Sequence, residues 1–173
     1  MALLTPCLAS PRPAWPWALL ASLALVPAVA VAQVDESRLK AAFVYNIVAF
    51  ASWQGVAAAE PLHICAVTGS QLDVELAALS GRMVGRRKID VQRGSVDAGC
   101  DVLVHAGGTG ALPAATPSSA LVVCDGCSHG DGYSAVLLAR DGERVRFDVD
   151  AGVASRSGVD FSSQLLRLAR RVL

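Results

Sequence analysis

A serine lies in a pattern that matches a known catalytic motif. Residues 126–130 read Gly-Cys-Ser-His-Gly, which fits the G-x-S-x-G elbow with Ser128 as nucleophile. The elbow needs a buried strand before the serine and a helix directly after it, because that sharp turn exposes the hydroxyl group. A strand-like run precedes Ser128, but residues 130–132 are Gly-Asp-Gly, and no histidine comes after His129. The sequence therefore predicts no hydrolase chemistry at this loop.

Two cysteines of the same segment, Cys124 and Cys127, form a C-x-x-C pattern. In thioredoxin-like proteins this pattern starts a helix that lowers the pKa of a thiol, and no helix is expected here. A zinc site built from Cys124, Cys127 and His129 would lack a fourth ligand, since the other cysteines lie far away in the sequence. We therefore expect a short structural disulfide, with metal binding as a minor alternative.

The glycine-rich segments and the remaining histidines add no catalytic or cofactor site. Residues 105–110 read His-Ala-Gly-Gly-Thr-Gly, but neither the Lys-Ser/Thr pair of a P-loop nor a helix follows them. Gly69 is a lone glycine after a strand-like run, and His63 and His105 are expected at strand ends. The sequence thus predicts a non-enzymatic protein without a bound cofactor or metal.

Composition limits the class of protein. The chain has 173 residues, of which 53% are hydrophobic and 17% charged, and this excludes a disordered or coiled-coil protein. Lys+Arg and Asp+Glu both number 15, so the net charge is zero and no basic field is available to hold nucleic acid. The length suits one domain.

The first 32 residues have the character of a secretory signal peptide. They contain no acidic residue and a single cation, Arg12, and their apolar run from Ala14 ends in Ala-Val-Ala. This A-x-A ending predicts cleavage between Ala32 and Gln33, and the alternative is an uncleaved membrane anchor. Residues 33–173 would then form the exported domain.

Cysteine usage agrees with export. Cys7 would be removed with the signal peptide, which leaves an even number of cysteines in the mature chain: Cys65, Cys100, Cys124 and Cys127. An even count in an exported chain favours two disulfides, and four cysteines allow three pairings. A chain of this length buries a core without them, so the disulfides would add stability to a fold that forms anyway.

Hydrophobic periodicity predicts a single α/β domain with a mixed sheet flanked by helices. Amphipathic helices are expected at both ends of this domain, over residues 35–53 and from about residue 160 to the end. Between them we expect a short helix over residues 71–79 and strands over residues 62–67, 88–92, 100–105 and 120–124. A hairpin follows, with strands over residues 134–139 and 144–149 joined through Asp141-Gly142.

Each terminal helix is expected to bury one mainly apolar stripe at helical spacing. The stripe of the first helix contains Leu39, Ala42, Phe43, Asn46, Ile47, Phe50 and Trp53. That of the last helix contains Phe161, Leu165, Leu168, Ala169 and Val172, with Ser162 or Asp160 as N-cap.

Five segments of the expected domain, taken in order, form a recognisable set. They read Leu-Lys-Ala-Ala-Phe-Val-Tyr-Asn at 39–46, Gly-Arg-Met-Val-Gly-Arg at 81–86, Cys-Asp-Val-Leu-Val at 100–104, Val-Arg-Phe-Asp-Val-Asp at 145–150, and Ser-Ser-Gln-Leu-Leu-Arg-Leu-Ala at 162–169. Together they resemble the YfiR family of periplasmic regulators, and the last segment is the most specific. The resemblance covers essentially all of residues 33–173.

This resemblance implies a periplasmic repressor without chemistry of its own. Family members are thought to bind the periplasmic sensing domain of an inner-membrane diguanylate cyclase or sensor and to keep it inactive. Release, by redox change or by capture at an outer-membrane lipoprotein, then raises cyclic di-GMP. The resemblance also implies a homodimer and the pairings Cys65–Cys100 and Cys124–Cys127. The alternative is a periplasmic protein that binds small molecules in a crevice at strand ends.

Overall fold

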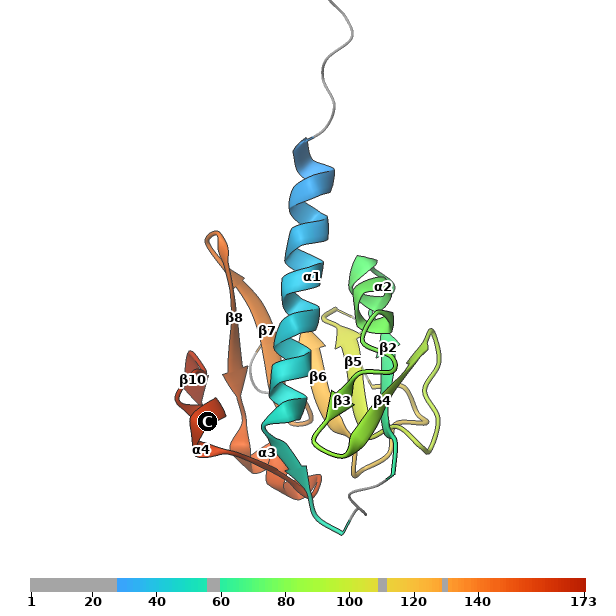
Figure 1. Ribbon diagram of the computed structural model, residues 1–173. Coiled ribbons are helices and arrows are strands. Elements are labelled where there is room, and N and C mark those ends of the chain that lie inside the picture. Colours follow the sequence, from blue (N-terminus) through green and yellow to red (C-terminus); the bar gives the residue numbers. More distant parts are fainter. Residues whose placement is uncertain (1–27, 56–59, 109–111, 129–130) are drawn as a thin grey trace, which may run out of the picture.

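The computed structural model describes residues 28–55, 60–108, 112–128 and 131–173 (Figure 1). Its helices are α1 (Ala28–Ala49), α2 (Gln71–Ala77), α3 (Ala151–Arg156) and α4 (Ser163–Leu166). Its strands are β1 (Ala51–Trp53), β2 (Leu62–Val67), β3 (Met83–Val84), β4 (Arg87–Arg93), β5 (Val102–Ala106), β6 (Leu121–Asp125), β7 (Val136–Asp141), β8 (Arg144–Val149), β9 (Val159–Phe161) and β10 (Arg171–Val172).

The main sheet is mixed, with strand order β10-β8-β7-β6-β5-β2-β4-β3. Its central pairs β2–β4, β2–β5, β5–β6 and β6–β7 are parallel, whereas β7–β8 and β3–β4 are antiparallel. The expected hairpin is β7–β8, and its turn places Gly142 at a φ of 61°, where glycine is favoured. The expected fold class, a single α/β domain with a mixed sheet flanked by helices, is confirmed.

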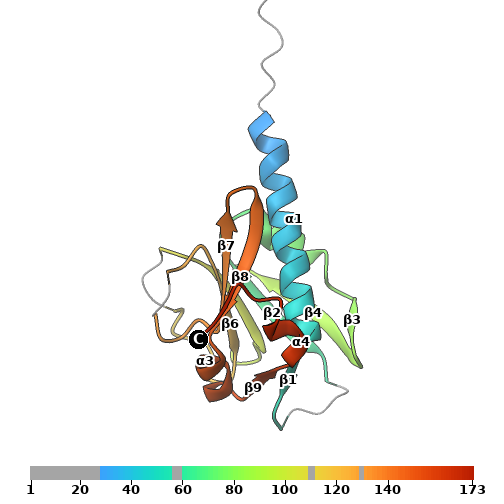
Figure 2. The same cartoon turned by 90° about the vertical axis from the view of Figure 1, so that its left-hand side faces the viewer.

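The two faces of the sheet bury different groups because side chains alternate along each strand. Helices α1 and α2 cover one face (Figures 1 and 2), and the main core lies between them and the sheet. Strands β2, β5 and β6 contribute alternate residues to this core: Leu62, Ile64, Ala66, Val102, Val104, Leu121 and Val123. On the other face, the intervening residues Cys65 and Leu103 form a smaller buried cluster with Cys100, which precedes β5.

The first helix differs from its prediction in end point and in buried face. It ends at Ala49, because the next residues form β1, which pairs with β9. Its buried positions are Ala41, Val44, Ile47 and Val48, so only Ile47 of the predicted stripe is fully buried. Small and β-branched side chains let the helix approach the sheet closely, and the larger rings of Phe43 and Phe50 are partly buried at the margin of this contact. No helix within the described residues is both long enough and apolar enough to cross a membrane.

The expected C-terminal helix is wrong in extent. The two ends of the expected helix form strands instead. At its start, β9 pairs with β1, and near its end β10 pairs in parallel with β8. Only the single turn α4 is helical, and Ser162 caps it as predicted. The chain then leaves the helix because Arg170 N donates to the carbonyl of Phe147 and Leu173 N donates to that of Val149. These long-range bonds replace the bonds that a longer helix would have made within itself.

Candidate functional site

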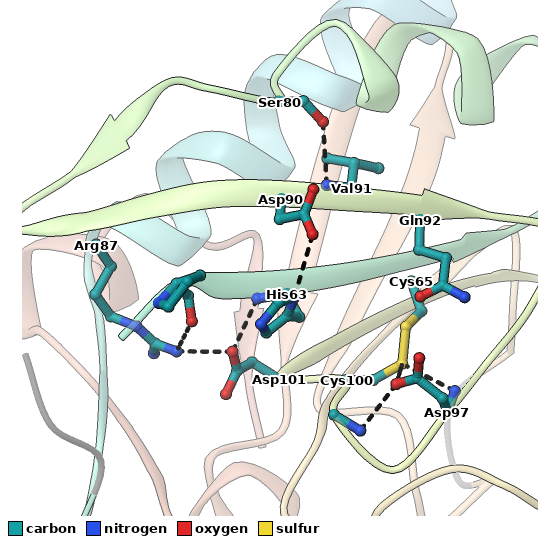
Figure 3. A network of polar contacts seen from close by, with 12 residues as sticks. His63, Cys65, Ser80, Arg87, Asp90, Val91, Gln92, Asp97, Cys100 and Asp101 are labelled. Carbon is teal, nitrogen blue, oxygen red and sulfur yellow. Dashed lines mark hydrogen bonds and ion pairs between the residues drawn. A yellow bond between two sulfur atoms is a disulfide. The ribbon is translucent and has the colours of Figure 1, made fainter. Parts of the chain in front are cut away.

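A disulfide ties an inner strand of the sheet to its neighbour. Cys65 of β2 and Cys100, just before β5, are bonded, with Cα atoms 5.9 Å apart. Both cysteines are buried against Leu103, and Figure 3 shows the bond beside the carboxylate of Asp97. This is the first of the two pairings that the resemblance implied.

The second disulfide, Cys124–Cys127, closes the loop after β6, with Cα atoms 5.7 Å apart. It is the other implied pairing. Cys124 is fully buried, Cys127 is partly buried, and Ser128 beside it is exposed. The next described element is β7 rather than a helix, so the strand–turn–helix geometry of a nucleophile elbow is not found in the described residues. His129 lies outside those residues.

The disulfide loop packs directly against the end of β5. Gly107 N donates to the carbonyl of Asp125 at 2.7 Å, and Gly126 N donates to that of Leu138 at 2.9 Å. A Cβ atom at Gly107 would lie 2.5 Å from the carbonyl oxygen of Gly126 and 2.9 Å from the nitrogen of Cys127. The sequence excluded a P-loop at residues 105–110, and the structure shows that Gly107 is required for the close approach of two backbones.

On the helix side, Asp125, the last residue of β6, forms an ion pair with α1. Lys40 Nζ lies 2.8 Å from the carboxylate of Asp125 and 2.7 Å from that of Glu36. Burial disfavours the charged ammonium, but hydrogen bonds and charges from Asp125 and Glu36 outweigh this and raise the pKa of Lys40. The hydrogen bond from Lys40 is also the main cause of a lowered Glu36 pKa. The end of β6 is therefore fixed to α1 by charge, and the loop that follows it is fixed to the sheet by backbone bonds.

His105 lies beside the second disulfide. It sits in β5, as expected, but it is only 3% exposed. One ring nitrogen of His105 and the sulfurs of Cys124 and Cys127 all lie within 4.8 Å of one another. Burial lowers the pKa of His105, and this outweighs the opposing effects of the Ala106 carbonyl and the charge of Asp131. The ring is thus kept neutral near pH 7.

A polar network joins β2, β4 and the start of β5 at the other end of the strands (Figure 3). Arg87 Nη2 lies 2.7 Å from a carboxylate oxygen of Asp101, and this oxygen also accepts a hydrogen bond from His63 N at 2.8 Å. The guanidinium of Arg87 lies 5.5 Å from the centre of the Trp53 ring. Both residues line a cavity of about 270 Å³. Within the described part of the chain, Arg87 Nη1 and Trp53 Nε1 are buried without a hydrogen-bond partner.

A buried carboxylate anchors the C-terminal segment. Asp148 of β8 is 1% exposed and accepts two hydrogen bonds from Arg170, at 2.8 and 2.6 Å, while Arg171 Nε lies 3.8 Å away. Arg170 and Arg171 lie in the segment that was expected to be a helix from about residue 160 to the end. Arg170 instead forms a bidentate pair whose hydrogen bonds raise its pKa.

The structure does not test the predicted cleavage site of the signal peptide. Residues 1–27 lie outside the described residues, and Ala32 and Gln33 lie within the first turns of α1. The boundary therefore stays a prediction, and N-terminal sequencing of exported protein is expected to begin at Gln33. A mature chain that retains Trp15 and Trp17 would contradict it.

Residues 37–170 match the family model described as YfiR/HmsC-like. This range takes in both disulfides, the loop after β6 and the Arg87 network. A search of curated proteins found no match to the chain.

Proposed function

Because this chain belongs to the YfiR/HmsC-like family, we propose that it is an exported regulator that represses an inner-membrane diguanylate cyclase or sensor. It binds the periplasmic sensing domain of that partner and thereby controls cyclic di-GMP. The observation that carries the proposal is the family match across residues 37–170. Two disulfides support it, because disulfides persist in an oxidising compartment such as the periplasm.

The regulator acts by binding and has no catalytic chemistry of its own. The elbow motif around Ser128 lacks its supporting helix within the described residues, which is consistent with this part of the proposal. A binding protein represses an enzyme only by its higher affinity for the inactive state. Moving the partner from almost fully active to almost fully inactive needs about a 10⁴-fold difference in affinity between the two states.

The test is made in cells that carry the candidate cyclase in the inner membrane. Expression of the full chain is expected to lower cyclic di-GMP, and the cyclase should co-purify with the oxidised protein from solubilised membranes. The matched control is a chain that lacks residues 1–32 and stays in the cytoplasm, which should leave cyclic di-GMP unchanged. Equal repression by both chains, or no change with either, would contradict a regulator that acts from the periplasm.

A homodimer and capture by an outer-membrane lipoprotein complete the proposal. The last segment supports a dimer, because Leu168, Val172 and Leu173 are exposed apolar residues. Val172 belongs to β10, which lies at one edge of the main sheet, and exposed apolar edge strands favour pairing between chains. Light scattering after gel filtration measures the mass, and the variant V172K should shift a dimer toward the monomer. Co-purification of the wild-type chain with outer-membrane fractions tests lipoprotein capture.

The second candidate function is a periplasmic protein that binds small molecules. It is favoured by the cavity beside Trp53 and Arg87, because two buried N–H groups without partners match an anionic ligand next to an aromatic ring. Calorimetric titration with small aromatic carboxylates tests it. The variant W53F keeps an aromatic ring but loses the N–H donor of the indole, and it should weaken any such binding. Absence of binding by the wild type would exclude this ligand class.

A further inference from the structure

A histidine and the short disulfide lie together on the face of the sheet opposite α1. His105 of β5 and Cys124 of β6 are direct neighbours in the parallel ladder, so their side chains leave the same face. A ring nitrogen of His105 and the sulfurs of Cys124 and Cys127 all lie within 4.8 Å of one another. While the two sulfurs are bonded to each other, neither is available as a thiolate ligand.

The imidazole ring of His105 is held as metal-binding histidines are held. Its Nδ1–H donates to the carbonyl of Ala106 at 3.1 Å. Its Nε2 is buried and has no hydrogen-bond partner among the described residues. Histidine ligands of metals usually donate one N–H to a carbonyl or carboxylate, which fixes the tautomer and leaves the other nitrogen to bind the ion.

The surroundings of His105 favour a cation. Asp131 acts on the ring through its negative charge. The Oδ1 atom of Asp131 is held in place by the backbone N–H groups of Tyr133 and Ser134, at 3.1 and 2.9 Å. Its Oδ2 atom and the hydroxyl of Ser134 are buried and lack partners within the described ranges. The negative charge of Asp131 favours a cation near His105.

We propose that reduction of Cys124–Cys127 turns this cluster into a binding site for a zinc-like divalent cation, with His105, Cys124 and Cys127 as ligands. A dithiol supplies two electrons and two protons and becomes a disulfide, while the Cys124–Cys127 bond is replaced by two thiols. The cation then displaces both thiol protons, binds the two thiolates and the imidazole, and keeps water in the fourth position. Sulfur and nitrogen ligands with C-x-x-C spacing select Zn²⁺ over Mg²⁺ or Ca²⁺, which prefer oxygen.

The site needs movement only in the loop. Tetrahedral Zn²⁺ with Zn–S bonds of about 2.3 Å places its two sulfurs about 3.8 Å apart, so the sulfurs must separate after reduction. Cys124 is fixed within β6, whereas Cys127 lies outside regular structure, after Gly126 with its φ of 78°. Cys127 is also the more exposed of the two, and a reducing thiolate reaches it first. The disulfide and the metal site exclude each other, and this inference does not depend on the proposed regulatory function.

The experiment is a titration of the full chain with Co²⁺, which reports tetrahedral thiolate ligands by its visible spectrum. The protein is titrated as purified and again after reduction by a phosphine, without oxygen. The reduced protein is expected to bind about one equivalent, with thiolate charge-transfer bands that Zn²⁺ removes. The oxidised protein is expected to show no thiolate charge-transfer bands.

Control variants separate this site from other ligand sets. Cys65, Asp97 and Cys100 form the second cluster within 4.8 Å, and His63 lies 3.4 Å from Asp90 near the surface. The variants C65A/C100A and H63A should therefore keep the Co²⁺ spectrum of the reduced chain. The variant C124S/C127S should lose it.

Variants of the histidine complete the test. H105Q and H105N should each weaken Zn²⁺ binding by roughly tenfold or more. Two variants are made so that the test stands if only one of them folds. Circular dichroism of each oxidised variant checks the fold. Equal Co²⁺ binding before and after reduction would overturn the proposal. So would a spectrum lost in C65A/C100A but kept in C124S/C127S, or a Zn²⁺ affinity within twofold of wild type in a folded His105 variant.

Discussion

The two disulfides are expected to contribute very different amounts of stability. Cys65–Cys100 joins residues 35 apart in the sequence, and Cys124–Cys127 joins residues 3 apart. In the chain-entropy model, stabilisation grows with the logarithm of the loop length. It amounts to about 4 kcal/mol for the long loop and about 2 kcal/mol for the short one near room temperature. Loop closure alone thus predicts a difference of about 2 kcal/mol between the corresponding double variants.

Packing increases this difference. Cys65 and Cys100 are both buried in the cluster around Leu103, so their replacement by alanine removes buried sulfur and leaves a cavity. Cys127 is partly exposed, and the loop that carries it has room to relax. C65A/C100A should therefore lose at least about 2 kcal/mol more of the free energy of unfolding than C124A/C127A.

Urea denaturation of the oxidised proteins, followed by far-UV circular dichroism, measures both losses. With an m-value of about 2 kcal/mol/M, the midpoints of the two variants should differ by about 1 M. Peptide mapping by mass spectrometry checks that the remaining disulfide is intact in each variant. Equal midpoints, a lower midpoint for C124A/C127A, or crossed pairings in the wild type would refute this reasoning.

Three further changes probe other contacts of the described residues. Gly107→Ala should lower the urea midpoint, because the added Cβ would overlap the carbonyl of Gly126. It should also speed the reduction of the neighbouring disulfide by a dithiol, and an unchanged reduction rate would contradict this packing. Arg170→Met should cost about 2 kcal/mol in urea denaturation, because Asp148 loses two charge-assisted hydrogen bonds, and a wild-type midpoint would count against that pair. His105→Gln should flatten the loss of thermal stability between about pH 7 and about pH 5.5. In the wild type, burial lowers the pKa of His105 in the folded state, so the unfolded chain takes up the proton first and stability falls as pH drops through the unfolded value of 6.5. Identical pH slopes would contradict a buried neutral ring.

Local sequence patterns were enough to predict the central strands. The runs at residues 62–67 and 120–124 are short, apolar and bounded by turn residues, and such runs are typical of strands buried on both faces. Asp141-Gly142 predicted the hairpin for a local reason as well, since the turn needs a residue with positive φ and Gly142 adopts one.

The C-terminal segment shows where local patterns fail. Phe161, Leu165, Leu168 and Val172 have helical spacing, but Leu168 is 63% exposed and Val172 lies in β10. Pairing with β1 and β8 decided this segment, and those partners lie far away in the sequence. Propensity is a weak prior that such tertiary contacts override.

The disulfide pairing and the position of His105 needed different kinds of information. Four cysteines allow three pairings, and only the family resemblance selected Cys65–Cys100 with Cys124–Cys127. His105 was expected only at a strand end because its neighbour depends on strand order and register. Once β5 and β6 are placed side by side in parallel, the register pairs His105 with Cys124 and sets them on one face.

The same alternation explains why the end of β6 is connected to groups on both faces of the sheet. Cys124 points toward His105, and the next residue, Asp125, points the other way and meets Lys40 of α1 at 2.8 Å. Two adjacent residues therefore attach one strand end to a buried histidine and to the first helix.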